Sequence, residues 1–293
     1  MKKIAQVLHA HGGHWVGDGF PVRTLFSYDG DAQAVSPFLL FDYAGPHVFP
    51  PAMRPRGVGQ HPHRGFETVT IVYDGEVSHR DSTGAGGTIG PGDVQWMTAA
   101  GGIIHEEFHS PSFTKTGGPF RVVQLWVNLP VKDKLTKPGY QSITNADIPV
   151  VELANGAGRA RIIAGDFAGS DGVVTKGPAT SFSPINVWDL RVNRDADVTL
   201  ELPQGHTAMV AVLSGRVTIN GKDGVGEAEI VRLERDGTTV KLRADSDAML
   251  LVLTGEPLGE PVYGYGPFVM TNEAEIRQAI DDFNGGRFGQ VAH

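Results

Sequence analysis

HPHRGFE, residues 61–67, places two histidines one residue apart, immediately before a strand-like run from Phe66 to Tyr73. Side chains two residues apart in an extended chain point to the same face, so we expect His61 and His63 to grip one metal ion from a rigid edge. Further along the chain, GIIHEE (102–107) sets His105 and Glu107 on one face in the same way. Three imidazoles and one carboxylate from two strands predict a mononuclear metal site with room for exogenous ligands.

Three neighbouring residues compete for the place of the fourth ligand: Glu106, Glu107 and His109. Strand alternation puts Glu107 and His109 on the face of His105, and Glu106 on the other face. Glu107 lies one step closer to His105 than His109 does, so Glu107 is the predicted ligand. A His-x-His pair alone is weak evidence in a chain with 11 histidines. Its combination with Pro-Gly-Asp at 91–93 and Gly-x-x-His at 102–105 is what favours a metal site.

Composition bounds the function. The 293-residue chain has a net charge of −8 and no basic stripe, which argues against direct binding to nucleic acid. It contains no cysteine, so disulfides, thiolate nucleophiles, zinc ribbons and iron–sulfur clusters are excluded. The apolar run at the N-terminus is too short for a signal peptide, and no run of about 18 apolar residues would span a membrane. We therefore expect a cytoplasmic protein.

The 39 glycines and 19 prolines favour short strands joined by tight turns. Asp74-Gly75 predicts a hairpin, and antiparallel strands without a long helix predict a closed barrel or jelly roll. Residues 46–59 and 130–141 are interpreted as a loop and a connector, and the histidines at 9, 11 and 14 as part of an irregular lead-in strand. The strands expected in the first half are 22–28, 37–43, 66–73, 76–81, 94–98, 103–108 and 121–129.

A second β-rich half follows, with strands expected at 159–164, 187–192, 198–202 and 207–219. Residues 207–219 repeat the layout of 67–79, with Gly215 at the place of Gly75. Counting from these turns, Glu201 and Pro203 replace the first histidine pair, and 241–243 replaces the second half-site, so the second half is expected to be metal-free. Residues 271–284 predict the one convincing helix, capped by Asn272 with Glu275 three residues later.

The chain resembles the pirin family of bicupins over nearly its whole length. The stretches that carry the resemblance are specific to that family. They are HPHRGFETVTIV (61–72), HRDSTGAGGTIGPGDVQWMTAAGGIIHEE (79–107), FRVVQLWVNLP (120–130), GEPLGEPVYGYGPFVM (255–270) and EIRQAIDDFNGGRFG (275–289). The family's metal pattern, His-x-His followed by His-x-Glu, falls on His61, His63, His105 and Glu107.

This resemblance implies an all-β fold of two tandem cupin (jelly-roll) β-barrels with a C-terminal helix that packs on the N-terminal half. The expected ranges are 1–140 for a metal-binding cupin, 141–270 for a metal-free cupin, and 271–293 for a helix and tail that return to the N-terminal domain. One divalent metal per chain is expected, typically Fe²⁺, although Ni, Mn, Co, Cu and Zn suit the same ligands.

Two classes of function follow from the resemblance. Several bacterial relatives resemble quercetin 2,3-dioxygenases, which open a flavonol ring with O₂ and release carbon monoxide, with Glu107 as the expected base. Others resemble non-enzymatic regulators that bind a transcription factor or a metabolic enzyme. Both classes need the same ligands, but a dioxygenase also needs a cavity deep enough for a three-ring substrate.

Further residues are candidates for the surroundings of the metal. Glu67, His79 and Gln124 would orient the ligand imidazoles, or are ordinary polar residues of strands. Phe66, Trp96 and Trp126 would line a flat aromatic pocket, or belong to the barrel core. Arg64 would attract an anionic substrate at the mouth of the site, or is solvated.

Overall fold

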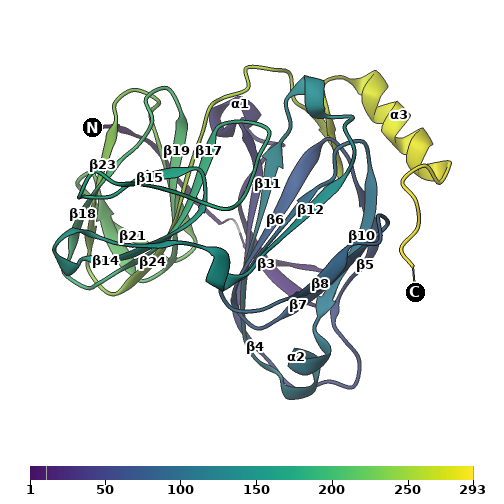
Figure 1. Cartoon of the computed structure of the whole chain (residues 1–293), viewed down its shortest axis with the longest axis horizontal. Coiled ribbons are helices and arrows are strands. Elements are labelled where there is room, and N and C mark those ends of the chain that lie inside the picture. The colour runs from purple at the N-terminus through teal and green to yellow at the C-terminus, as the bar shows by residue number, and fades with distance from the viewer. Residues whose placement is uncertain (11, 293) are drawn as a thin grey trace. The chain divides into compact units, whose positions relative to one another are not determined.

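The computed structural model describes residues 1–10 and 12–292, and only the backbone of Asp223. Its strands form two separate β-barrels, and the longest helix, α3 (Glu273–Asn284), lies at the C-terminal end of the chain (Figure 1). The predicted fold class is confirmed. The two compact units divide the described chain into residues 12–33, 38–145 and 259–292, called the N-terminal barrel, and residues 1–10, 34–37 and 146–258, called the C-terminal barrel.

The N-terminal barrel consists of a seven-stranded sheet and a four-stranded sheet. The larger sheet has the order β12-β9-β6-β11-β4-β3-β2, and the smaller has the order β5-β10-β7-β8. The bounds are β2 (His14–Val16), β3 (Phe20–Ser27), β4 (Phe38–Phe49), β5 (Gly57–His63), β6 (Phe66–Asp74), β7 (Val77–Asp81), β8 (Gly86–Ile89), β9 (Val94–Thr98), β10 (Ile103–His109), β11 (Gly118–Asn128) and β12 (Gly139–Ile143).

The C-terminal barrel repeats this arrangement, with sheets ordered β1-β22-β19-β24-β17-β14-β13 and β18-β23-β20-β21. The bounds are β1 (Ile4–His9), β13 (Val150–Glu152), β14 (Gly158–Ala164), β17 (Ile185–Val192), β18 (Asp197–Glu201), β19 (Thr207–Ser214), β20 (Arg216–Ile219), β21 (Lys222–Gly226), β22 (Glu229–Leu233), β23 (Thr239–Ala244) and β24 (Ala248–Gly255). The hairpins β6–β7 and β19–β20 turn at Gly75 and Gly215, whose φ angles are 86° and 82°.

Several short elements complete the fold. Two further strand pairs are β15 (Asp166–Ala168) with β16 (Val174–Lys176), and β25 (Tyr263–Tyr265) with β26 (Phe268–Met270). The other helices are α1 (Ala32–Val35) and α2 (Pro111–Thr116), with 3₁₀ turns at Val131–Asp133, Asn145–Asp147 and Ala154–Gly156. Within the described residues, no helix is long and apolar enough to cross a membrane. The cytoplasmic location stays a prediction.

The ends of the chain cross between the two units, and here the structure differs from the expected ranges. β1 was assigned to the N-terminal cupin, but it pairs antiparallel with β22 at the edge of a C-terminal sheet. The hairpin β25–β26 was assigned to the C-terminal cupin, but it belongs with the N-terminal barrel. Pairing between segments so far apart in sequence leaves no local pattern that would reveal it.

Two local expectations were also wrong. β4 continues to Phe49 and β5 begins at Gly57, so part of the stretch 46–59 is strand rather than loop. The histidine pair lies immediately before β6, as expected, but it also ends a strand of its own, β5, after which Gly65 turns the chain. The end of the presumed connector 130–141 lies in β12, which pairs with β9. Of the N-terminal histidines, His9 ends β1 and His14 starts β2, while His11 lies outside the described residues.

Helix α3 caps one end of the N-terminal barrel. Asn272 is its N-cap and accepts a hydrogen bond from the amide of Glu275 at 3.0 Å, as predicted. Its apolar face packs with Phe268, Met270, Phe288 and Ile104 of β10 in one cluster. On the same helix, Asp282 forms a buried ion pair with Arg64, at 2.8 Å. The helix therefore docks on both segments that carry the predicted ligands.

Lys134 is a buried cation that holds the turn after β5. Its ammonium donates hydrogen bonds to the carbonyls of Gly65 at 2.8 Å and Val269 at 2.9 Å, and to the side chain of Asn128 at 2.6 Å. The residue is 2% exposed. Burial lowers the pKa of Lys134 to about 7, although the charges of Glu260 and Glu275 act to raise it.

We predict that Lys134 makes stability depend on pH above 7. A lysine in the unfolded chain keeps its proton to about pH 10.4, so the unfolded state binds more protons than the folded state between these values. The free energy of unfolding of wild type, minus that of Lys134→Met, should therefore rise by roughly 2 kcal/mol from pH 7 to 9 and level off below pH 7. Urea unfolding at each pH measures this difference. The exposed Lys132→Met is the control, and a flat Lys134 difference would contradict the prediction.

Candidate metal centre

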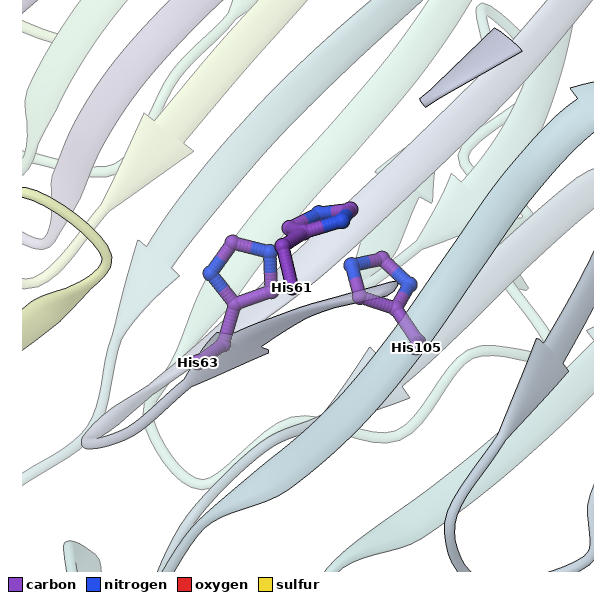
Figure 2. A group of neighbouring side chains, drawn as sticks. All are labelled: His61, His63 and His105. Atoms are coloured by element: carbon purple, nitrogen blue, oxygen red, sulfur yellow. The ribbon is translucent and has the colours of Figure 1, made fainter. Parts of the chain in front are cut away.

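The pairing of β5 with β10 brings three imidazoles together. In this antiparallel register His61 lies directly opposite His105, and His63 opposite Ile103. Residues opposite one another on neighbouring strands share a face, as do residues two apart on one strand. All three rings therefore point to the inside of the barrel, where Figure 2 shows them turned toward one another.

The three histidines are close enough to share one ion. Their ring centroids lie 4.2 to 4.9 Å apart, and one nitrogen of each lies within 4.8 Å of the others. His63 and His105 are buried, and His61 is half-buried. His79, His105 and Glu107 meet the same criterion as a second group, which shares His105 with the first. The structure thus assembles a candidate His/Glu metal site.

A hydrogen bond identifies the free nitrogen of one ring, and lack of a hydrogen-bond partner marks it on the other two. His61 Nδ1 lies 2.8 Å from the carbonyl of Gly59, which can only accept, so Nε2 carries the lone pair. His63 Nδ1 and His105 Nε2 are buried and have no hydrogen-bond partner within the described chain. Buried polar atoms are rarely left unpaired. Two such nitrogens beside a third free one fit a bound cation.

A buried chain of side chains sets the tautomer of His105. His79 Nε2 lies 3.1 Å from Asp81 Oδ2, and His79 Nδ1 lies 3.3 Å from His105 Nδ1. Burial acts to raise the pKa of Asp81, but hydrogen bonds from His79 and Thr83 outweigh it and hold the pKa below the ordinary value. The carboxylate is therefore an acceptor, which favours the tautomer of His79 that donates through Nε2 and accepts at Nδ1. His105 then donates through Nδ1 and directs the lone pair of Nε2 toward the site.

The charge state of the rings suits metal binding. Burial, and then the neighbouring histidines, hold the pKa values of His63 and His105 well below the ordinary value of 6.5. Both imidazoles are consequently neutral at neutral pH. A neutral imidazole is the form that coordinates a metal.

Among the three competitors for the fourth place, the structure brings Glu107 to the site. Glu107 Oε1 lies 3.3 Å from the hydroxyl of Thr70 on the inner face of β6. Glu106 points to the other side of β10 and pairs with Arg80 at 2.5 Å. His109 Nε2 is bonded to the carbonyl of Gly19 at 2.9 Å, among phenylalanine rings. Strand alternation explains why Glu106 is excluded from the site, and distance along β10 explains why His109 is excluded.

A cavity of about 300 Å³ opens onto these side chains. His61, His63 and Glu107 line it on one side, and Gln124 and Trp126 on another. Its remaining walls are mostly apolar, formed by Val16, Phe20, Val22, Ala44, Val58 and Val122, together with Asp42 and Thr70. A mostly apolar pocket with a few convergent polar groups is the usual form of a small-molecule site.

Two of the candidates for the surroundings of the metal line this cavity: Trp126, expected in the pocket, and Gln124, expected to orient an imidazole. Gln124 accepts a hydrogen bond from Thr70 at 2.8 Å, and Trp126 presents its ring to His63 with centroids 5.4 Å apart. Phe66 stacks behind Trp126, with centroids 4.3 Å apart. Trp96 is fully buried and does not line the cavity.

For Glu67 the structure fits the second alternative, an ordinary polar residue of a strand, whereas both alternatives for Arg64 were wrong. Glu67 lies on the opposite face of β6 from Thr70 and accepts a hydrogen bond from Thr98 at 2.7 Å. Arg64 neither guards a mouth nor faces solvent. Its guanidinium donates to the carbonyl of Gly101 at 2.7 Å and to Asp282 at 2.8 Å, and lies over the ring of Phe288. Because Gly65 turns the chain after β5, Arg64 points toward α3.

Three residues at the site escaped the sequence analysis: Asp42, Asp81 and Tyr140. Asp81 could have been found, because it lies two residues after His79 and hence on the same strand face. Tyr140 stacks on His79 with ring centroids 5.2 Å apart. Burial, then the charges of Asp81 and Glu107, raise the pKa of Tyr140 to about 12. It was hidden in the stretch interpreted as a connector.

Comparison with known proteins shows which family the chain belongs to. Residues 19–127 match the sequence profile of pirin, and residues 187–289 match that of the pirin C-terminal cupin domain. A Pseudomonas aeruginosa protein named "Putative quercetin 2,3-dioxygenase" is 57% identical over 98% of this chain and 99% of its own. A pirin-like protein of Caulobacter vibrioides is 39% identical over 97% of this chain and 99% of its own.

Solved structures give the same result. The crystal structure of quercetin 2,3-dioxygenase from Acinetobacter baumannii superposes with a TM-score of 0.95, at 52% identity and with full coverage of both chains. The bacterial pirin YhhW of Escherichia coli in complex with nickel(II) has a TM-score of 0.64 at 20% identity, over 86% of this chain and 99% of its own, which shows the shared fold. The chain belongs to the pirin family.

Proposed function

We propose that this protein is a metal-dependent dioxygenase that opens the ring of a flavonol such as quercetin with O₂. The observation that carries the proposal is the convergence of three imidazoles and Glu107 at an apolar cavity of about 300 Å³. The names of the 57% and 52% identical relatives support the same reaction.

His61, His63 and His105 would hold one divalent metal through the nitrogens identified above, with Glu107 beside them. Fe²⁺ is the proposed ion, although such nitrogen and oxygen donors also accept Mn, Co, Ni, Cu and Zn. When bound, the metal supplies Lewis acidity toward the 3-hydroxyl of the flavonol and a redox partner for O₂. The stoichiometry is one metal per chain, because both candidate ligand groups in the described residues share His105.

The protein's own groups account for the remaining chemistry. Glu107 lines the cavity and takes the proton of the flavonol 3-hydroxyl as general base. Thr70 lies within reach of Glu107 at 3.3 Å and of Gln124 at 2.8 Å, so it limits the orientations of the carboxylate. The valine and phenylalanine walls receive the flat rings and exclude water from them.

The cavity also bears on the regulatory alternative. A metal sensor needs access only for a small oxidant, whereas a dioxygenase needs room for its organic substrate. A volume of about 300 Å³ lies at the lower end of the range for small-molecule sites, which supports the enzyme. A protein partner stays a prediction from the resemblance, as does a role that involves it.

We predict that His105→Ala removes the metal and leaves the fold intact. The alanine takes away the imidazole shared by both ligand groups, while the strand ladder of β10 is made by the backbone. The metal content measured by elemental analysis should fall from one equivalent per chain to below about a tenth of an equivalent. The far-UV circular dichroism spectrum should stay unchanged. His9→Ala, at an exposed histidine of the other unit, is the control and should keep a full equivalent. Two equivalents in the wild type would refute the single site.

Asp81→Asn should weaken metal binding without touching a ligand. Asparagine keeps the oxygen that accepts from Thr83, but presents an N–H to His79 Nε2 in place of Oδ2. His79 must then carry its proton on Nδ1, which removes the acceptor for His105. We expect affinity to fall about 10- to 100-fold in a chelator competition assay. Ser78→Ala, on the outer face of the same strand, should bind like the wild type, and an equal loss in both variants would argue against the relay.

Glu107→Gln should abolish turnover while Glu106→Gln leaves it nearly unchanged. Loss of a general base costs about 10²- to 10⁴-fold in rate, whereas Glu106 pairs with Arg80 away from the cavity. The measurement is O₂ uptake and loss of the flavonol absorption band, with Fe²⁺-loaded proteins at equal metal content and quercetin as substrate. Wild-type turnover by Glu107→Gln would show that the carboxylate is no base and would favour the regulatory role.

A further inference from the structure

A row of polar side chains crosses the inner face of the seven-stranded sheet in the N-terminal barrel. Thr24, Asp42, Gln124, Thr70 and Gln95 lie opposite one another on β3, β4, β11, β6 and β9. The next row toward one side is apolar and consists of Val22, Ala44, Val122 and Val72. Burying polar groups costs free energy unless they are hydrogen-bonded. A polar row beside an apolar row inside a barrel therefore indicates a function for the polar side chains.

The C-terminal barrel shows what this row holds where there are no clustered histidines. Thr70 precedes Gly75, and Val210 precedes Gly215, by the same five residues in equivalent hairpins. The corresponding row there is Ile162, Trp188, Val252, Val210 and Val231, on β14, β17, β24, β19 and β22. All five belong to the apolar core of that barrel. The polar row is therefore not required by the fold, and Asp42 occupies the place of Trp188.

Asp42 is only half satisfied by the protein. Its Oδ1 accepts a hydrogen bond from the hydroxyl of Thr24 at 2.5 Å. No described residue donates a hydrogen bond to Oδ2, and Asp42 lines the cavity together with Gln124. Burial raises the pKa of this carboxyl, against the hydrogen bond from Thr24 and the charge of His14. Asp42 Oδ2 is therefore available to accept a hydrogen bond from a ligand in the cavity.

The position of Asp42 fixes which part of a ligand it would meet. Thr70 touches Glu107, and Asp42 lies two strands further across the sheet. Neighbouring strands are about 4.8 Å apart, so Asp42 is roughly 10 Å from Thr70 along the row. The amide of Gln124 lies between them, with its oxygen turned to Thr70. A ligand held at the histidines would present its far end to Asp42.

We propose that Asp42, with Gln124 beside it, is a recognition subsite for a hydroxyl group at the end of the ligand remote from the metal. The subsite selects neutral, hydroxylated aromatic molecules and rejects carboxylates. The proposed subsite rests on the proposed function for the nature of the ligand. It adds a group that would distinguish flavonols by the hydroxyls on their outer rings. A hydroxyl donating to a charged acceptor forms one of the stronger hydrogen bonds in proteins.

The test compares three ligands on zinc-loaded protein, in which no turnover consumes them. They are quercetin, 3-hydroxyflavone, which lacks the hydroxyls on the outer rings, and 3-hydroxyflavone with a carboxylate on the phenyl ring. We expect wild type to bind quercetin at least about tenfold more tightly than 3-hydroxyflavone, and the carboxylate most weakly. In Asp42→Asn the amide nitrogen faces the cavity in place of an acceptor, so the preference for quercetin should fall to about threefold or less, and the penalty on the carboxylate should shrink.

Asp29→Asn, a loss of a carboxylate at an exposed position of the same barrel, should retain the wild-type preference. An equal loss of affinity for all three ligands in Asp42→Asn would mean a structural role and overturn the subsite. So would wild-type binding of quercetin and 3-hydroxyflavone with equal affinity, and that result would leave the proposed dioxygenase function intact. Failure of metal-loaded wild type to bind either flavonol would overturn the flavonol function and the subsite together.

Discussion

The antiparallel register of β5 against β10 is the constraint on which the rest of the site depends. A shift by one residue would send the histidines of β5 to the outer face of the sheet. Gly57 at the start of β5 and Gly65 just after its end allow close backbone contacts there. A Cβ on Gly57 would lie 2.2 Å from the carbonyl oxygen of Glu107, and one on Gly65 would lie 2.0 Å from that of Val269. Gly65 also has a φ of 92°, which other residues rarely adopt.

The two barrels have the same strand order, but different kinds of side chain fill their interiors. The C-terminal barrel is filled with hydrocarbon around Trp188. The N-terminal barrel gives up part of that packing to a cavity and a set of buried polar groups, each of which needs a partner. Outside the cavity, α3 contributes an apolar cluster and the ion pair of Arg64 with Asp282, and Lys134 donates three hydrogen bonds.

Sequence alone was sufficient where the relevant physics is local. Strand alternation placed His61, His63, His105 and Glu107 on one face, and paired glycine turns revealed the repeat of the two barrels. β5 was missed as a strand because it contains one proline and two glycines. An edge strand tolerates these residues, but a pattern search interprets them as a loop. Asp42 was missed because one carboxylate in the apolar run FLLFDYAG gains meaning only when its cross-strand neighbours Thr24 and Gln124 are known. Arg64 was misjudged because its partner lies more than two hundred residues away.

The crossing of the chain ends has a consequence for the order in which the molecule is made. Domains generally fold as they leave the ribosome, starting from the N-terminus. Here β1 must wait for β22 before it has a neighbour, and the strands that carry the histidines must wait for residues 259–292 before their end is covered. Until residues 269–282 have been synthesised, the turn after β5 lacks both the carbonyl of Val269 beside Lys134 and the carboxylate of Asp282 beside Arg64. The barrel synthesised first is thus the one that matures last, and a metal ion offered to the nascent chain would meet ligands that are not yet held in place.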